Sequence, residues 1–430
     1  MPASALSIHD EEGAQLNFDV EAIVGSFHSD KSYAQLNADD ERSDWQEAYI
    51  KLGLSGNKAL GEKGSEVFGG VSVLAGGTFG DGDAAGFTTG DEFETDLEDA
   101  YIGWRSGNLI EALGENGLEI SVGRQNLAIG DGFLINGDAL NFGEGFEQIP
   151  GSPDFNRGGA YWLAARKAFD QTVVLRVGGD SGARGDLFWL ESDNASQGMM
   201  ELAGINLEYV TEQGTLAAAY IEGLGVDAET ADFLDLTHRD GQETLSLRAQ
   251  GNAGVENLFL STEWVTQDQG DTTRPDADAY YVEAGWTFAD VAWSPSLNYR
   301  YSTFDTGFDP LFFGFNRGYG TWFQGEVASN FAGPFNSDTD VHHIALKVAP
   351  SETLTFGALF FDFNDTDSGA GTLDAQEIDL YAEWVVNDHL IISPLIGFYS
   401  PDNSTLSGGG SQIGNADTNT YGQIIAIIPF

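Results

Sequence analysis

The sequence lacks cysteine, is poor in basic residues and has no long apolar run. None of its 430 residues is Cys, and 18 Lys and Arg stand against 68 Asp and Glu, a formal net charge of −50. A protein that faces the periplasm avoids unwanted oxidative pairing if it has no Cys. The shortage of positive charge argues against nucleic-acid binding through a basic surface. No run approaches the roughly 20 apolar residues that a membrane helix needs, so a helical membrane protein is excluded.

Glycine and aromatic residues are abundant instead. The chain has 56 Gly, 29 Phe, 14 Tyr and 9 Trp, as expected of the tight turns and aromatic girdles of a transmembrane β-barrel. Modest overall hydrophobicity fits this class, because barrel strands alternate and their polar half hides them from hydropathy scans. The acidic excess is compatible with adaptation to salt, with cation-binding loops or with an acidic vestibule.

Period-two alternation is the dominant pattern along the chain. It begins near Gln15, where Leu, Phe, Val and Ala alternate with Asn, Asp and Glu. Each such stretch has about ten residues, the length that a tilted strand needs to cross a hydrocarbon core. Eighteen strands are therefore predicted, the first near 15–24 and the others near 44–54, 66–76, 96–106, 118–127, 158–168, 171–179, 200–211, 213–223, 242–251, 256–266, 279–289, 295–305, 340–348, 352–362, 376–386, 389–399 and 420–430.

The connections between these strands alternate between short and long. Short links such as 169–170 and 252–255 are followed by long ones such as 306–339, the pattern of periplasmic turns and extracellular loops. The apolar piece at 187–190 would break this order as a full strand, so we place it in an outer loop. We predict one all-β domain over residues 1–430, an antiparallel transmembrane β-barrel of about 18 strands.

The last stretch, residues 420–430, is predicted to close the barrel. It alternates apolar or small residues and ends on Phe430, which resembles the assembly signal of bacterial outer-membrane barrels. We expect it to pair with 389–399 and with the first strand, leaving no open edge in lipid. The expected partners are therefore outer-membrane lipid, lipopolysaccharide and the barrel-assembly machinery. The first ten residues contain no signal peptide, so we interpret the sequence as a mature form.

Basic residues within the predicted strands are candidate pore-lining groups. Arg248, Arg300 and Lys347 lie on the polar face of their strands by parity, and facing lipid would cost each about 2 to 4 kcal/mol near the midplane. The full set of solute-guiding candidates is Lys51, Arg105, Arg124, Arg248, Arg300 and Lys347. Their guanidinium and ammonium groups could guide anions, or could brace the wall by pairing with lumen carboxylates. The two interpretations are compatible.

Acidic, glycine-rich segments are the candidates for metal binding. Asp81, Asp83 and Asp91 offer oxygen ligands of the kind that calcium prefers, but their spacing does not match the twelve-residue calcium loop. A solvated loop face is the competing interpretation. We find no Ser/His/Asp arrangement, Cys/His site, phosphate loop or dinucleotide fingerprint, so we expect neither an enzyme nor a cofactor beyond loop-bound calcium.

The segment Gly123 to Phe133, GRQNLAIGDGF, resembles the alginate-export family of outer-membrane porins. That family carries a Gly-Arg-Gln strand leading into a Gly-Asp-containing loop, and its barrel has 18 strands. The resemblance implies that anionic polysaccharide or related sugar acids pass an arginine-bearing constriction, with Arg124 carried over by position. The connection 130–156, with Asp131, Phe133, Phe142 and Phe146, is too hydrophobic for a freely solvated loop and is predicted to fold inward and narrow the barrel.

A passive outer-membrane channel for hydrophilic solutes, anionic or of the sugar-acid and oligosaccharide type, is the predicted function. No energy coupling is implied, since strand patterning begins near Gln15 without a preceding plug domain. The acidic balance favours one alternative, a nonspecific or cation-preferring diffusion porin. A second alternative is a barrel-anchored surface protein whose loops bind ions, polysaccharide or a partner.

Overall fold

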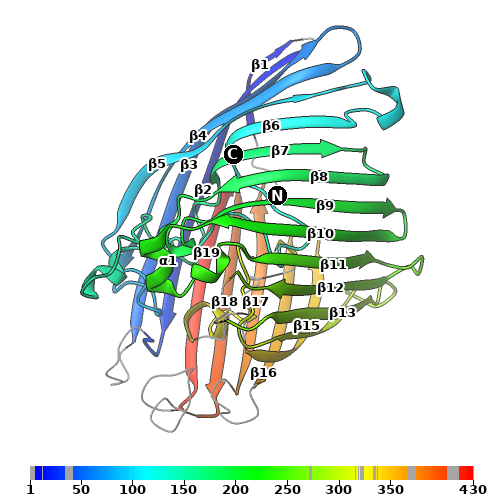
Figure 1. Cartoon of the computed structure of the whole chain (residues 1–430). Helices are drawn as coiled ribbons and strands as arrows, with labels where there is room; N and C mark the ends of the chain where they lie inside the picture. The colour runs from blue at the N-terminus through cyan, green and yellow to red at the C-terminus, as the bar shows by residue number, and fades with distance from the viewer. Residues whose placement is uncertain are drawn as a thin grey trace.

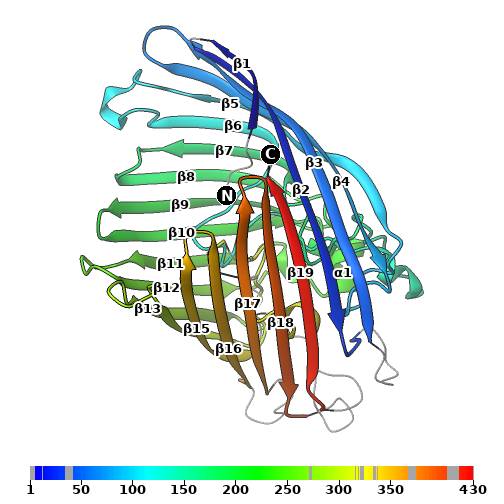
Figure 2. The ribbon, with the colours of Figure 1, turned by 180° about the vertical axis from the view of Figure 1, so that it is seen from behind.

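Alternating side chains build one closed antiparallel sheet. The computed structural model of the protein describes residues 5–11, 13–33, 42–270, 274–314, 316, 317, 319, 324–332, 336, 338–366, 374–403 and 416–429. In these residues each strand from β2 to β19 pairs with its neighbours in sequence, and β19 also pairs with β2, so 18 strands close into a barrel (Figures 1 and 2). No helix in the described part of the chain is long and apolar enough to span a membrane.

The elements follow one another in chain order around the barrel. The strands are β1 (Ala5–Glu11), β2 (Ala14–Ser29), β3 (Ser43–Leu60), β4 (Ser65–Gly80), β5 (Phe93–Arg105), β6 (Leu118–Gln125), β7 (Phe169–Val177), β8 (Gly182–Glu191), β9 (Glu201–Thr211), β10 (Gly214–Gly225), β11 (Glu243–Gly251), β12 (Leu258–Asp268), β13 (Ala277–Thr287), β14 (Ser296–Phe304), β15 (Thr339–Ser351), β16 (Leu354–Asp365), β17 (Ala375–Asn387), β18 (Leu390–Pro401) and β19 (Asn419–Pro429). Short helical turns lie between some of them: η1 (Glu111–Leu113), η2 (Glu144–Gln148), η3 (Ala195–Gln197), α1 (Ala228–Leu234), η4 (Thr237–Arg239) and η5 (Ala328–Ala332).

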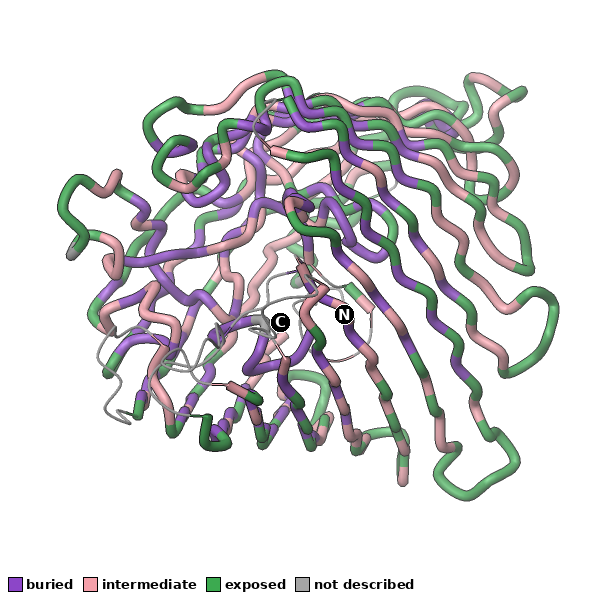
Figure 3. The backbone as a smooth tube through the Cα atoms, turned by 60° about the horizontal axis from the view of Figure 1, so that its bottom comes forward, coloured by how far each residue is buried: buried purple, intermediate pink, exposed green. Residues whose placement is uncertain are grey.

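Burial alternates residue by residue along the wall, as Figure 3 shows for strand after strand. On β11, Leu247 points outward and is 48% exposed, whereas the neighbouring Arg248 side chain is 9% exposed. Outward apolar side chains form the surface that faces lipid, and polar side chains face the lumen. The parity argument that placed Arg248 and Arg300 inside the barrel therefore agrees with their burial.

The closing strand lies where the sequence predicted it. Ile427 of β19 is opposite Ile391 of β18 on one side and Ile23 of β2 on the other. Figure 2 shows β19 between these two strands. The terminal Phe430, which was predicted to sit at the periplasmic interface, lies outside the described residues. The closure of the barrel is thus confirmed.

A short strand before Gln15 was not predicted. β1 pairs with the first part of β2, from Ala14 to Asp19. The pairing of β19 with β2 ends at Glu21, so β1 covers the stretch of β2 that the closing strand does not reach. An edge that would otherwise be open is paired in this way.

One predicted strand is wrong: residues 158–168 form part of a long outer connection, 126–168. The alternation there reflects packing against the inner wall, where Tyr161 and Leu163 are buried. The backbone N–H groups of Trp162 and Leu163 donate to the carboxylate of Glu47 on β3, at 3.2 and 2.9 Å, instead of to a neighbouring strand. The predicted short link 169–170 is therefore wrong as well, because it belongs to β7.

The placement of residues 187–190 in an outer loop is also wrong. They form the second half of β8, with Leu187 outward and Phe188 buried inside. The first half of β8, Gly182 to Asp186, is polar and glycine-rich, which hid the strand from a search for apolar alternation. The wrongly predicted strand 158–168 and the missed strand β8 compensate each other, so the predicted total of 18 barrel strands is confirmed.

Two long outer connections, 126–168 and the described residues of 305–338, fold against the inner wall in two apolar clusters. In one cluster Phe133 packs on Tyr281 and Phe304, with ring centroids 5.4 and 5.9 Å apart. In the other, Phe142 stacks on Phe87 at 4.3 Å. The two connections also bond to each other, since the Asn136 N–H donates to the Phe312 carbonyl at 2.7 Å.

Candidate functional site: a charge ladder on the lumen wall

Residues of opposite charge alternate from strand to strand across the inner wall from β4 to β8. Arg105 is opposite Glu66 on one side and Glu119 on the other, and Arg176 is opposite Glu119 and Asp186. Arg105 contacts Glu66 and Glu119 at 3.1 and 3.0 Å. Arg176 contacts Glu119 and Asp186 at 2.6 and 3.6 Å. Each guanidinium is therefore held between carboxylates on the neighbouring strands.

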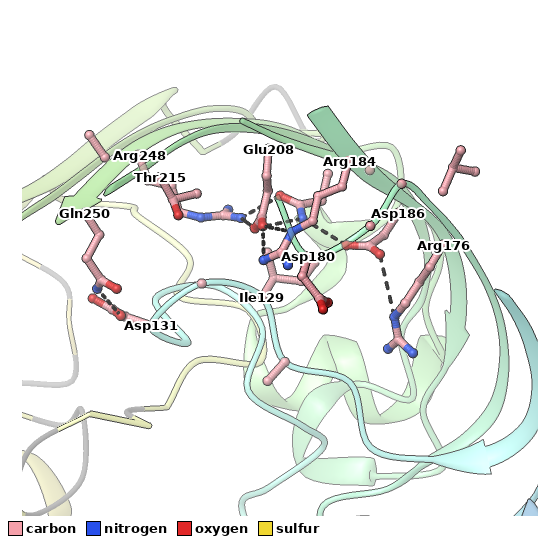
Figure 4. A pocket seen from close by; sticks show the side chains of 18 of the residues that line it. Ile129, Asp131, Arg176, Asp180, Arg184, Asp186, Glu208, Thr215, Arg248 and Gln250 are labelled. Atoms are coloured by element: carbon pink, nitrogen blue, oxygen red, sulfur yellow. Dashed lines mark hydrogen bonds and ion pairs between the residues drawn. The ribbon is translucent and has the colours of Figure 1, made fainter. Parts of the chain in front are cut away.

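The alternation continues on β8, β9 and β11. Arg184 Nε donates to Glu208 at 2.7 Å, and Arg248 Nη2 donates to Glu208 and Asn206 at 2.7 and 2.6 Å. Figure 4 shows these side chains side by side along the wall, from Arg176 to Arg248. We call the set the charge ladder; its members are Glu66, Arg105, Glu119, Arg176, Asp186, Arg184, Glu208 and Arg248.

The charge ladder runs obliquely across the wall, away from the end of the barrel that carries the short turns. Strands in a barrel are tilted, so a row of laterally paired residues is inclined to the barrel axis. Arg105 is the last residue of β5, at the end that carries the short turns, whereas Arg248 lies near the middle of β11. Charged groups thus follow a spiral from the short-turn end toward the middle of the barrel.

The charge ladder forms one side of a cavity of about 700 Å³. Residues 128–131 of the long outer connection form part of its other side, and the short turn after β7 reaches its rim. Six carboxylates and four guanidinium groups line it: Glu115, Glu119, Asp131, Asp180, Asp186 and Glu208, with Arg105, Arg176, Arg184 and Arg248. The cavity is therefore polar and densely charged, with a local excess of negative groups.

Asp131 fixes the outer connection over this cavity. Its carboxylate accepts hydrogen bonds from Gln250 at 2.7 Å, from the Tyr281 hydroxyl at 2.8 Å and from Arg317 at 2.9 Å. Burial acts to raise the pKa of Asp131, but the charge and hydrogen bonds of Arg317 outweigh it, so the pKa is lower than usual. The hydrogen bonds of this carboxylate hold the Gly-Asp segment to the wall.

Arg124 belongs to a second group of charges, nearer the long connections. Its Nη1 lies 2.6 Å from Asp170 and 2.7 Å from Asp193. Arg157 and Arg166 approach the same Asp193, at 3.2 and 4.0 Å. Burial acts to raise the pKa of Asp193, but the three arginines lower it overall. Arg124 therefore pairs with carboxylates and does not line the ladder cavity.

The structure separates the other predicted residues. Lys51 of β3 lies 3.8 Å from Asp99 of β5. Arg300 is buried, and its Nη2 donates to Gln324 at 3.2 Å. Lys347 is exposed near the short-turn end of β15. Among the predicted guides, Arg105 and Arg248 share the cavity. Phe142 and Phe146 stack on each other at 5.3 Å, whereas Phe133 belongs to the other apolar cluster.

Sequence reasoning missed Arg157, Arg184 and Arg317 as site residues. Arg176 lay in the predicted strand 171–179 but was not among the six solute-guiding candidates. Arg184 was missed together with strand β8. Arg157 and Arg317 lie outside every stretch with period-two alternation, so no sequence signal placed them.

The acidic loop residues serve the structure of their own loops. Asp83 accepts hydrogen bonds from the backbone of Ala85 at 2.8 Å and from the Thr88 N–H and hydroxyl at 2.7 and 2.6 Å. Burial raises the pKa of Asp83 to about 6, against the lowering effect of these bonds. Asp81 accepts from the Asp44 N–H at 3.1 Å, and Asp91 from the Thr89 hydroxyl at 2.7 Å. No metal-binding group of three or more His, Cys, Asp or Glu occurs among the described residues, and loop-bound calcium stays a prediction.

The closed barrel with its lipid-facing apolar surface and charged lumen places the protein among outer-membrane porins. It is similar to the crystal structures of Pseudomonas aeruginosa OpdO, with 12% identity, 97% of each chain covered and a TM-score of 0.58, and of Acinetobacter baumannii OccAB4, with 11% identity, 96% and 97% covered and a TM-score of 0.58. Pseudomonas aeruginosa OccK8 (OprE) has 10% identity, 96% and 97% coverage and a TM-score of 0.57. At these identities the likeness concerns the fold.

The family is given by the sequence. The family model described as alginate export matches residues 78–304, slightly more than half of the chain, and this range includes the Gly123 to Phe133 segment and the ladder residues from Arg105 to Arg248. The chain therefore belongs to the alginate export family and is an outer-membrane channel protein. No curated protein matches it.

Proposed function

We propose that the protein is a passive channel for carbohydrate solutes, with sugar acids and their oligosaccharides as the preferred class. The charge ladder along the 700 Å³ cavity is the observation that carries this proposal. A guanidinium offers a planar pair of donors to a carboxylate, and the ladder carboxylates can accept hydrogen bonds from sugar hydroxyls. The family and the fold both support a channel in preference to an enzyme.

Arginines that are already paired with carboxylates suit transport better than arginines that would bind a solute strongly. Each ladder arginine already has carboxylate partners, so a solute carboxylate that binds it must compete with groups such as Glu208. Conduction requires binding that is favourable enough to admit a solute and weak enough to release it, at several sites in succession. The spiral of exchangeable partners offers such a succession.

The connection 130–156 is the proposed constriction. Its first part is bound to the wall through Asp131, and its second part is packed through Phe142 and Phe146 against Phe87. Eighteen strands enclose a wide aqueous lumen unless something fills it. Residues of this connection occupy lumen space from two sides, which supports a narrowed path that brings solutes close to the charge ladder.

A cation preference for small ions is the second candidate. Six carboxylates against four guanidinium groups line the ladder cavity, and the whole chain carries a net charge of −50. Rings of carboxylates favour cation conduction. A channel of this kind would pass sugar acids through specific arginine contacts while conducting small cations more readily than small anions.

Planar-bilayer recording tests the proposal. The current through single channels is measured in a KCl gradient, then with added alginate trisaccharide and with added maltotriose. We expect a reversal potential of the sign that a cation-selective channel gives. We also expect both saccharides to block the current in a concentration-dependent way, with alginate trisaccharide acting at a lower concentration than maltotriose. Failure of both saccharides to affect the current would overturn the proposal.

A further inference from the structure

The tips of two aromatic rings lie over glycines of neighbouring strands on the inner wall. A Cβ added to Gly70 of β4 would lie 3.0 Å from Cε1 of Tyr101 on β5, and one added to Gly103 would clash with the ring of Phe68. The two rings are neighbours, with centroids 6.4 Å apart. The tip of each ring therefore rests on bare backbone, and the glycines are what allow this position.

The side that faces away from the glycine is covered in Phe68 and open in Tyr101. The Arg105 guanidinium lies over Phe68 at 4.2 Å, which covers that ring. Tyr101 is half-buried and borders a separate hollow of about 300 Å³. This volume lies at the lower end of the range of small-molecule pockets, about 300 to 1,000 Å³. The hollow and the ladder cavity share no lining residue, but β5 contributes to both, with Tyr101 in the hollow and Arg105 in the ladder cavity.

Polar groups surround the Tyr101 ring. Asp19, Lys51, Ser55, Ser72 and Asp99 line the same hollow. Their positions are fixed in part by each other, because the Ser72 hydroxyl donates to Asp99 at 2.6 Å and Lys51 lies 3.8 Å from Asp99. The hollow thus has one flat apolar wall and a rim of hydrogen-bonding groups.

This combination matches the chemistry of a pyranose ring. A pyranose has a flat face of C–H groups, which packs on an aromatic face, and a rim of hydroxyls, which need acceptors and donors. Carboxylates outnumber cations in the hollow, since Glu21 also lines it with Asp19 and Asp99 against Lys51. The site therefore favours hydroxyl groups over a carboxylate, in contrast to the ladder arginines.

We propose that the Tyr101 hollow is a saccharide-binding subsite at the short-turn side of the lumen, where a pyranose ring stacks on Tyr101 and its hydroxyls bond to Asp19, Asp99 and Lys51. The subsite rests on the proposed function, because it receives sugar units of the solute that the channel passes. It adds a contact that is independent of solute charge. Neutral and acidic saccharides both use it.

The test is saccharide block of single channels formed by the full chain and by two variants. Tyr101→Ala removes the ring, and Tyr101→Phe keeps the ring without its hydroxyl. We expect the half-blocking concentrations of maltotriose and of alginate trisaccharide both to rise about three- to tenfold in Tyr101→Ala, and to stay within about twofold of the wild type in Tyr101→Phe. Heat-resistant mobility of both variants on gels confirms a folded barrel.

The outcomes separate the subsite from the wider function. Block of Tyr101→Ala at wild-type concentrations would overturn the subsite and leave the proposed channel function intact. Equal loss in Tyr101→Phe and Tyr101→Ala would also overturn it, because ring stacking would then not be the source. A wild-type channel that neither saccharide blocks would overturn both proposals.

Discussion

At the scale of single residues, the arginines of the lumen are held by carboxylates, and the role of each depends on its partners. Arg248 is nearly buried and bonds to Glu208 and Asn206, whereas Arg42, in an outer loop, is 71% exposed and contacts Asp44 at the start of β3. These contacts agree with the bracing interpretation, and solute guidance by the same arginines stays a proposal. Under that proposal, position in the charge ladder distinguishes a solute contact from a surface charge.

Substitution of Arg248 should weaken the interaction with sugar acids selectively. In Arg248→Gln, the half-blocking concentration of alginate trisaccharide is expected to rise about tenfold, the equivalent of one hydrogen bond to a charged group. Block by maltotriose should change little. Arg42→Gln is the matched control and should behave as the wild type. Equal loss for both saccharides would speak against a carboxylate contact at Arg248.

A buried ion pair outside the strands makes stability depend on pH. Arg239 donates to Asp309 at 2.7 and 2.8 Å, and His238 Nε2 lies 2.9 Å from the same carboxylate. Burial acts to raise the pKa of Asp309, but the charge of Arg239 and the bonds from His238 and Arg239 lower it well below its usual range. A carboxyl whose pKa is lower in the folded state than in the unfolded state stabilises the fold. This stabilisation is fully present above the ordinary pKa of about 3.9 and is lost as the pH falls toward the folded-state pKa.

Asp309→Asn is therefore expected to reduce the free energy of unfolding by about 3 to 5 kcal/mol at pH 7. The difference from the wild type should shrink as the pH falls below about 4. Urea titrations of the barrel in lipid vesicles measure it. Asp235→Asn, at a side chain that is 96% exposed beside Arg274, is the control and should have little effect. Equal stability of Asp309→Asn and the wild type at pH 7 would show that the pair contributes nothing.

At the scale of elements, the long connection 126–168 contains the proposed constriction of the path. Deleting residues 138–147 removes Phe142 and Phe146 from their cluster with Phe87 and takes backbone out of the lumen. Single-channel conductance in KCl should rise in the deletion variant, provided that the barrel keeps its heat-resistant mobility on gels. A folded variant with wild-type conductance would mean that the connection does not form the constriction.

The strands could be predicted because lipid on one side and water on the other impose period-two alternation. The prediction failed where another cause produced or hid that period. Residues 158–168 alternate because they pack against the inner wall and bond to Glu47, and β8 begins with the polar stretch from Gly182 to Asp186, so it lacked an apolar signal. The contacts of Asp131 and Arg317 join segments far apart in sequence without any periodicity, so sequence alone could not place them.

At the scale of the whole molecule, the barrel is closed by the register between its first and last full strands. The pairs of β19 with β18 and β2 involve successive residues from Tyr421 to Ile427. An assembly role of the chain end stays a prediction. Removal of Phe430 should lower the yield of folded barrel in cells while inserted channels keep near-normal conductance, as scored by outer-membrane fractionation and bilayer recording. Full yield with changed conductance would contradict this role.

The whole molecule combines a strongly acidic composition, a partly filled barrel and a spiral of paired charges. The proposed carbohydrate channel requires that saccharides cross this barrel. Swelling of proteoliposomes in an isosmotic solution of alginate trisaccharide measures that passage directly. The account predicts swelling well above that of protein-free liposomes, and slower swelling in Arg248→Gln. Wild-type proteoliposomes that swell in KCl but not in the trisaccharide would contradict the central claim.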